Sequence, residues 1–328
     1  MKVTFKNVGQ GDSLILEWHD DTGRKIGIID CNKKNKTNPV VDHIGTSYSE
    51  IEFLILSHPH SDHYSGYNGL LKHVEENDIT VKKFAHTLNN QGNDFYTHLK
   101  WTEINTEDME DLQTLVKNVD TLKKKGIIKK VEFISENWSQ QLAEGIILKC
   151  LSPSPDEVEA YMRLVALEPA KNKKRASSSA NYLSTLFSLV KGNDYYLLTS
   201  DCELSTFERL MKENQHAEFT GKSLHMGQLP HHGSSENFHP GFWNFIVKND
   251  KRHAVASSGY HLKYKHPHFD VLRIFHEDGF IIHSTNIVHG SEEFLEYLRK
   301  LSITSKKLDT VSTLIDSFTG GDKIFELN

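Results

Sequence analysis

Residues 51–63 read IEFLILSHPHSDH, and this stretch decides the fold. Its first half is a short, almost wholly apolar run, which is typical of a strand buried on both faces of a sheet. The residues after it, 64–74, carry apolar side chains at helical spacing. Between strand and helix, six residues hold four side chains that can bind metal: His58, His60, Asp62 and His63.

The spacing of these four side chains has a chemical explanation. Two imidazoles two positions apart on an extended segment point the same way, so His58 and His60 can reach one ion. Asp62 and His63 lie where the chain turns into a helix and can face a second ion. Zinc and related cations accept such nitrogen and oxygen ligands. A single histidine here would indicate an ordinary surface loop, whereas four ligands after an apolar strand favour a metal site.

The rest of the chain alternates short apolar runs with amphipathic segments. We expect strands at 2–6, 13–18, 25–29, 51–57, 130–134, 146–151, 183–190, 195–199, 223–229, 253–258 and 280–284. We expect helices at 64–74, 102–125, 155–167, 203–213, 238–248, 268–278 and 291–300. This order predicts an α/β fold, a sandwich of two mixed β-sheets flanked by helices.

The domain organisation follows from the same pattern. No internal repeat of fixed period and no long linker divides the 328 residues. We therefore expect a single domain over residues 1–328. It would include a helical insertion around residues 100–125 and a C-terminal extension, 302–328, whose structure the pattern leaves open.

Composition narrows the compartment and the partners. No run approaches the roughly 18 apolar residues that span a membrane, so we expect a cytoplasmic protein with no membrane partner. The three cysteines are sparse and widely spaced, which suits a reducing compartment. A net charge of −6 gives no support for a nucleic-acid partner, and the basic cluster 171–175 is more simply a solvated loop.

The HxHxDH pattern at 58–63 resembles the signature of the metallo-β-lactamase superfamily, whose fold is an αββα sandwich. Residues 197–201, LLTSD, resemble the strand end that carries the superfamily's bridging aspartate, here Asp201. A lone aspartate after a strand is otherwise most often a helix N-cap.

Further motifs resemble the ComEC-like branch of that superfamily. They run in chain order as VGQGDS at 8–13, NYLS at 181–184, HHGS at 231–234, and SSG at 257–259 followed by YKHP at 264–267. The last motif departs from the branch pattern, because Lys265 stands where a glycine is usual. Together they indicate the fold strongly and the substrate weakly.

The resemblance implies a set of site residues. His58 and His60 would bind the first metal, Asp62, His63 and His266 the second, and Asp201 would bridge the two. One histidine of the pair His231 and His232 would complete the first site, with His232 slightly favoured. The other, His231, would contact a substrate phosphate or protonate the leaving group, and Asp62 is the second catalytic candidate. Asp30 would orient a metal-binding histidine.

The implied chemistry is hydrolysis by hydroxide activated between two divalent ions, Zn²⁺ or Mn²⁺, about 3.5–4 Å apart. The ComEC-like motifs favour a phosphodiesterase or nuclease, acting on nucleic acid or on a small diester. Hydrolysis of a carboxylic ester, lactone or thioester is the alternative enzyme class. A partner-gated effector module of a multi-protein system, such as a defence operon, is the third hypothesis and would bring a protein partner. The oligomeric state stays open.

Overall fold

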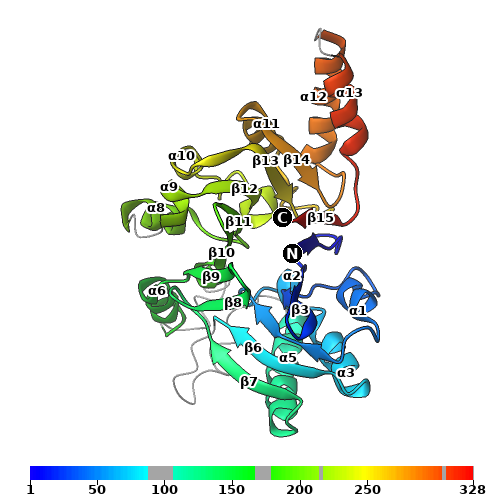
Figure 1. The fold of residues 1–328 in the computed structure, drawn as a ribbon, viewed down its shortest axis with the longest axis vertical. Coiled ribbons are helices and arrows are strands. Elements are labelled where there is room, and N and C mark those ends of the chain that lie inside the picture. The colour runs from blue at the N-terminus through cyan, green and yellow to red at the C-terminus, as the bar shows by residue number, and fades with distance from the viewer. Residues whose placement is uncertain (88–105, 167–178, 214–216, 305–307, 328) are drawn as a thin grey trace.

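The computed structural model describes residues 1–87, 106–166, 179–213, 217–304 and 308–327 (Figure 1). The basic cluster 171–175 and the first residues of the expected insertion, 100–105, lie outside these ranges.

The first sheet has strand order β15-β1-β2-β3-β5-β6-β4, with β7 paired to β6. Its strands are β1 (Lys2–Phe5), β2 (Leu14–Asp20), β3 (Gly23–Ile29), β4 (Glu50–Ile51), β5 (Phe53–Leu56), β6 (Thr80–His86), β7 (Ile128–Phe133) and β15 (Lys323–Glu326). Strands β1 to β3 and β15 pair antiparallel, whereas β3, β5, β6 and β7 pair parallel. The sheet is therefore mixed, and the last described strand returns to pair with the first.

The second sheet has strand order β14-β13-β12-β11-β10-β9-β8. Its strands are β8 (Ser139–Ala143), β9 (Ile146–Ser152), β10 (Leu186–Lys191), β11 (Asp194–Leu198), β12 (Ser223–Gln228), β13 (Lys248–Ala256) and β14 (Phe280–Ser284). Antiparallel hairpins form one half of it, and the strands from β11 to β14 are parallel. Parallel strands need helical crossovers, which explains why helices cover this half.

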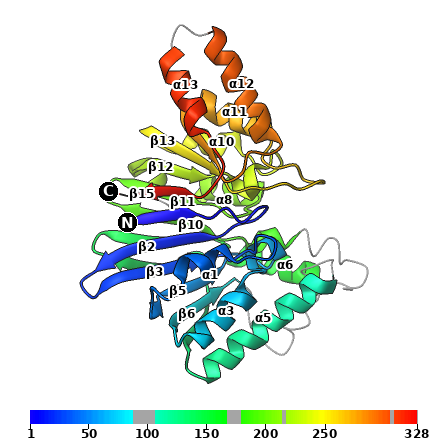
Figure 2. The same cartoon turned by 90° about the vertical axis from the view of Figure 1, so that its right-hand side faces the viewer.

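Helices cover the outer faces of both sheets, so the molecule has four layers (Figure 2). On the first sheet lie α1 (Pro39–Ile44), α3 (Tyr67–Glu76), α5 (Thr106–Lys124) and α6 (Pro155–Ala166). On the second lie α8 (Leu204–Glu213), α9 (Ala217–Gly221), α10 (Pro240–Phe245), α11 (Phe269–Glu277) and α12 (Gly290–Thr304). Helix α13 (Leu308–Ser317) pairs with α12 at one end (Figure 1). The αββα sandwich expected from the sequence is confirmed.

Three hydrophobic clusters match these layers, one under each helical layer and one between the sheets. Strand β5 shows how the sequence builds them. Leu54 and Leu56 face the helices, whereas Phe53 and Ile55 face the opposite sheet. All four are buried, because successive strand residues point to opposite faces and both faces are covered.

One helix prediction was too long. Residues 238–248 were expected to be helical, but α10 ends at Phe245 and β13 begins at Lys248, ahead of the expected 253. Ile246 is already extended, with φ −75° and ψ 142°. The first five residues of β13, 248–252, are polar or charged and none is buried, so they show no apolar strand pattern.

Among the described residues, none of the helices combines the length and the apolar character that a membrane crossing requires.

Candidate metal centre

Most of the expected site residues follow the carboxyl ends of strands from both sheets. Asp30 follows β3, His58 follows β5, Asp201 follows β11, the pair His231–His232 follows β12, and His266 follows β13. His60, Asp62 and His63 lie at the start of α2 (Ser61–Tyr64), the short helix after β5. Strand ends of the two sheets therefore meet at one edge of the sandwich.

The carboxylate of Asp201 is the centre of the cluster, and each of its oxygens faces two imidazoles. Oδ1 lies 3.4 Å from His63 Nε2 and 3.6 Å from His232 Nε2. Oδ2 lies 3.7 Å from His58 Nε2 and 3.4 Å from His231 Nε2. Asp201 is 1% exposed, so these contacts are shielded from bulk water.

The other ring nitrogen of each imidazole is occupied by the protein. Nδ1 of His63 lies 2.7 Å from Asp30 Oδ2, that of His232 lies 2.8 Å from the Ser257 carbonyl, that of His231 lies 3.0 Å from Asn237 Oδ1, and that of His58 lies 3.2 Å from Ser57 Oγ. A nitrogen that donates to a carboxylate or carbonyl leaves the opposite nitrogen with a lone pair. When these rings are neutral, the Nε2 atoms of His63 and His232 therefore present lone pairs toward the Asp201 carboxylate.

Such an arrangement fits a cation. His63 Nε2, His232 Nε2 and Asp201 Oδ1 are buried and have no hydrogen-bond partner among the described residues. Buried polar atoms without partners cost free energy. A divalent cation coordinated by these atoms would satisfy all three at once, and imidazole with carboxylate is a donor set that zinc accepts.

Two more ligand candidates extend the cluster in opposite directions. Asp62 Oδ2 lies 3.3 Å from His232 Nε2, and Asp62 Oδ1 lies 3.9 Å from His63 Nε2. His60 Nδ1 lies 3.1 Å from His58 Nε2. Asp62 thus lies near His63 and His232, and His60 lies near His58, while His58 and His63 are themselves within 4.8 Å of each other and of Asp201.

The electrostatics match a carboxylate surrounded by imidazoles. Burial alone would raise the pKa of Asp201, but His231, His232 and His63 outweigh burial and hold that pKa well below its ordinary value. Burial would lower the pKa of His63, but the carboxylates of Asp201 and Asp30 raise it well above the ordinary value. For His58, burial and then the charge of His63 hold the pKa well below 6.5, which favours the neutral ligand form.

Asp30 lies behind His63, at the position expected for a carboxylate that orients a ligand. Besides His63 it accepts hydrogen bonds from the Ser57 backbone N–H at 2.8 Å and the Ser57 hydroxyl at 2.6 Å. Ser57 Oγ in turn lies 2.9 Å from Ser200 Oγ, next to Asp201. These bonds fix the ring of His63 and tie the strand ends of the two sheets together.

Asp12 is a buried residue of the site that the sequence reasoning missed. It is 1% exposed and lies 3.9 Å from His232 Nδ1 and 4.0 Å from His63 Nδ1, behind both rings. Its Oδ2 accepts a hydrogen bond from Gln228 at 2.8 Å, and its N–H donates to the Asp62 carbonyl at 3.0 Å. The sequence did contain an indication, because Asp12 belongs to the VGQGDS motif. That motif served only as evidence for the family resemblance, and no role was assigned to its aspartate.

The turn at residues 8–13 reaches this position because Gly11 lacks a side chain. A Cβ at Gly11 would lie 2.1 Å from the carbonyl oxygen of Asp62, and its φ of +121° is disfavoured for other residues. The turn therefore packs directly on the backbone of residues 58–63, the loop that carries four of the candidate metal ligands.

His231 and His232 are placed differently from the expectation. His232 was slightly favoured as a partner of His58 and His60, but its Nε2 lies among Asp62, His63 and Asp201 Oδ1. His231 lies on the His58 side of Asp201 instead. Both residues adopt left-handed backbone conformations, with φ of 49° and 59°. The rule that successive side chains of an extended strand point to opposite faces therefore does not apply to these two residues.

His266 lies against the histidine pair rather than among the innermost donors. Its ring centroid is 5.3 Å from that of His231 and 6.3 Å from that of His232. Its Nδ1 is buried without a hydrogen-bond partner among the described residues. The described donor groups whose atoms lie within 4.8 Å of one another do not include His266. Its expected role as a ligand of the second metal stays a prediction.

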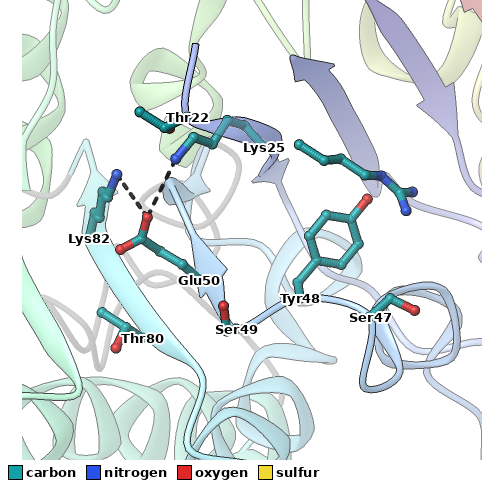
Figure 3. A pocket seen from close by; sticks show the side chains of 9 residues that line it. Thr22, Lys25, Ser47, Tyr48, Ser49, Glu50, Thr80 and Lys82 are labelled. Carbon is teal, nitrogen blue, oxygen red and sulfur yellow. Dashed lines mark ion pairs between the residues drawn. The ribbon is translucent and has the colours of Figure 1, made fainter. Parts of the chain in front are cut away.

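A hollow of about 680 Å³ is lined by residues from the start of β3 and from β4 and β6 (Figure 3). Lys25 stands near the start of β3, whereas Asp30 follows the end of that strand. The cations of the hollow are already neutralised, because Lys25 and Lys82 both pair with Glu50 and Glu52. The hollow is therefore separate from the histidine cluster.

The sequence matches no protein-family model, and no curated protein is similar to it in sequence. The structure is similar to the metallo-beta-lactamase fold protein YhfI from Bacillus subtilis, with TM-score 0.45 and 10% identity over 86% of this chain and 95% of that one. It is also similar to a diphosphatase from the PhnP family, with TM-score 0.39 and 12% identity over 83% and 91% of the two chains. A long form RNase Z from yeast has TM-score 0.36 and 11% identity over 81% and 38%. Similarity at this level does not extend to activity.

Proposed function

We propose that this chain is a metal-dependent hydrolase with two divalent cations held on either side of Asp201. His58, His60 and His231 with Asp201 Oδ2 would hold the first. Asp62, His63 and His232 with Asp201 Oδ1 would hold the second. The observation that carries the proposal is the convergence of buried, unpartnered imidazole Nε2 atoms on a buried carboxylate.

Two such ions supply Lewis acidity, which makes water nucleophilic near neutral pH and neutralises charge on a substrate oxygen. The protein determines where substrate meets the centre. His58, His63 and His232 have fully buried side chains, whereas the side chain of His231 is 25% exposed and that of Asp62 is 33% exposed. Substrate therefore approaches past His231 and Asp62, and Asp62 is placed to accept a proton there.

We further propose a phosphodiester as the substrate. The support is the ComEC-like series of motifs, two of which contribute residues to the cluster: Asp12 from the first, and His231 and His232 from the HHGS motif. A phosphodiester is anionic, so neutralisation by two cations lowers its barrier most. We expect zinc in preference to magnesium, because five of the seven proposed ligands are histidines.

The first test measures metal. We expect about two equivalents of zinc or manganese per chain by elemental analysis of purified protein, and well under one in the Asp201→Asn variant. This substitution keeps the side-chain shape and removes the charge that both donor groups share. Asp21→Asn, at an exposed position, is the matched control and should keep the metal.

The second test measures turnover. The metal-loaded protein should hydrolyse bis-para-nitrophenyl phosphate, and Asp201→Asn should lower kcat at least 100-fold. Full metal content in Asp201→Asn would contradict the proposed centre. Hydrolysis of a lactone or thioester panel without any diester turnover would keep the metal centre but replace the substrate by an acyl compound.

A further inference from the structure

We propose that the loop between β13 and α11, residues 259–266, is a platform that binds a nucleobase joined to a phosphodiester. The inference rests on the proposed hydrolase function and names the group that the same site recognises beside the scissile phosphate.

The loop gathers exposed apolar side chains. Tyr260 is 67% exposed, Leu262 is 76% exposed and Tyr264 is 46% exposed. Among the described residues Tyr260 and Leu262 are the two most exposed large hydrophobic side chains, and all three stand within five positions. Single exposed apolar residues are ordinary, but clusters of them mark binding surfaces.

The ring of Tyr260 is held in place although it faces solvent. It stacks on His289 with 5.1 Å between ring centroids and an interplanar angle of 21°. His289 Nε2 also accepts a hydrogen bond from the His261 N–H at 3.1 Å, which fixes the supporting ring. A fixed aromatic ring with one supported and one exposed face can stack a planar ligand at little entropic cost.

A series of rings links the platform to the proposed centre. Tyr264 stacks between His261, at 4.6 Å and 21°, and His266, at 5.9 Å and 24°. His266 contacts His231 with 5.3 Å between centroids, and His231 Nε2 lies 3.4 Å from Asp201. A ligand stacked on the loop therefore lies beside the side of the centre that substrate can reach.

The base of the loop is anchored to the turn at residues 8–13. A Cβ at Gly259 would lie 2.2 Å from the backbone N of Gln10, so the two backbones are in direct contact. The same turn donates from Asp12 to the Asp62 carbonyl. The platform and residues 58–63 are thus packed on one common segment, which keeps their separation constant.

The charge of the loop selects the occupant. Residues 257–269 contain two lysines, three histidines and no acidic residue. Neither Lys263 nor Lys265 forms an ion pair with a carboxylate of a described residue, although Lys263 donates a hydrogen bond to the Tyr264 hydroxyl at 3.1 Å and lies over that ring. Exposed aromatic rings beside cations that no carboxylate neutralises are the combination that binds single-stranded nucleic acid. The lysines would repel a choline-like cation, and they would form no charge interaction with an uncharged acyl chain.

Binding to two labelled strands tests the proposal. The first is an oligothymidylate of about 12 nucleotides, and the second is an abasic strand of equal length and charge. Phosphorothioate linkages in both slow cleavage, and a denaturing gel confirms that the strands are intact at readout. We expect the metal-loaded protein to bind the strand with bases about tenfold more tightly, as measured by fluorescence anisotropy.

Variants locate the effect. Tyr260→Ala should abolish most of the preference for bases, whereas Tyr260→Phe should keep it, because stacking needs the ring and not the hydroxyl. Lys263→Gln and Lys265→Gln should weaken the binding of both strands by similar factors and reduce the salt dependence of the affinity. Ile324→Ala, at an exposed apolar residue on β15, is the matched control and should change neither affinity.

The dinucleotide thymidylyl-thymidine identifies the source of the ligand. If it displaces the strand in a Tyr260-dependent way, a small diester suffices; if only the long strand binds, the ligand is nucleic acid. Equal affinity for the two strands would overturn the proposal, as would a Tyr260→Ala variant that changes the oligomeric state and not binding. Hydrolysis of bis-para-nitrophenyl phosphate reports on the proposed function separately, so the two failures are distinguishable.

Discussion

A pair of histidines far from the proposed metal ligands should make the protein sensitive to acid. His253 on β13 and His283 on β14 place Nδ1 and Nε2 2.9 Å apart, and both rings pack against Phe325. Burial, then His225 and Lys251, lower the pKa of His253 to about 4. Burial, then His253 and Lys323, lower the pKa of His283 to about 3. The folded protein thus keeps both rings neutral where the unfolded chain binds protons.

The sign and size follow from these pKa values. Below an ordinary pKa of 6.5 the unfolded chain takes up protons that the folded chain refuses, so the free energy of unfolding falls as pH falls. At a pH of about 5, some 1.5 units below 6.5, each ring costs about 2 kcal/mol at about 1.4 kcal/mol per unit. Both rings are part-exposed, so we expect about 2–3 kcal/mol for the pair.

Urea unfolding at pH values of about 7.5 and 5 measures this loss. The double variant His253→Asn with His283→Asn should lose less stability between the two pH values than the wild type does, by that same 2–3 kcal/mol. His19→Asn, at an exposed position, should retain the wild-type dependence. Comparing differences removes the contribution of the proposed metal centre, whose residues are the same in all three proteins. An unchanged pH dependence in the double variant would refute the reasoning.

Two further substitutions test how the cluster is supported. Asp30→Asn removes the charge that orients His63, so we expect zinc affinity, measured by chelator competition, to fall about 10–100-fold, and unchanged affinity would contradict that role. Gly11→Ala would place a methyl group 2.1 Å from the Asp62 carbonyl, so it should lower both the melting temperature and the metal content. Gly9→Ala, also at positive φ but with open space around it, should cost only about 1 kcal/mol, and equal effects of the two would exclude the contact.

Local patterns predicted the fold class because the buried faces of each strand and helix determine the spacing of its apolar residues. The apolar run before His58 indicated a strand covered on both sides, and Phe53–Leu56 is such a strand. The pairing of strands that are distant in the sequence is not visible in the apolar pattern of either strand. The antiparallel pairing of β15 with β1 joins residues more than 300 positions apart, and nothing in the sequence of either strand specifies it. Strand β6 was missed for another reason, since Lys82 and Lys83 interrupt its apolar pattern.

The residues of the candidate site could be predicted to the extent that they follow one another along the chain. His58, His60, Asp62 and His63 were found from their spacing, and the structure brings Asp201 among them from the other sheet. The distribution of His231 and His232 could not be predicted, because it depends on two consecutive left-handed residues. Asp12 could not be placed either, because its relation to His63 and His232 arises only when the turn packs on residues 58–63.

Backbone strain gives an independent argument that this edge of the sandwich serves chemistry rather than stability. Nine residues other than glycine have positive φ in the described chain, and five of them surround the cluster: Asp30, Ser200, His231, His232 and Lys265. Each such conformation costs about 1–3 kcal/mol, and glycine would avoid most of that cost. The strained residues at 231 and 232 do not repay it through apolar packing, since their side chains are polar and point at Asp201. What the strained conformations achieve is the direction of two adjacent imidazoles to opposite oxygens of one carboxylate, which an unstrained strand or helix cannot do.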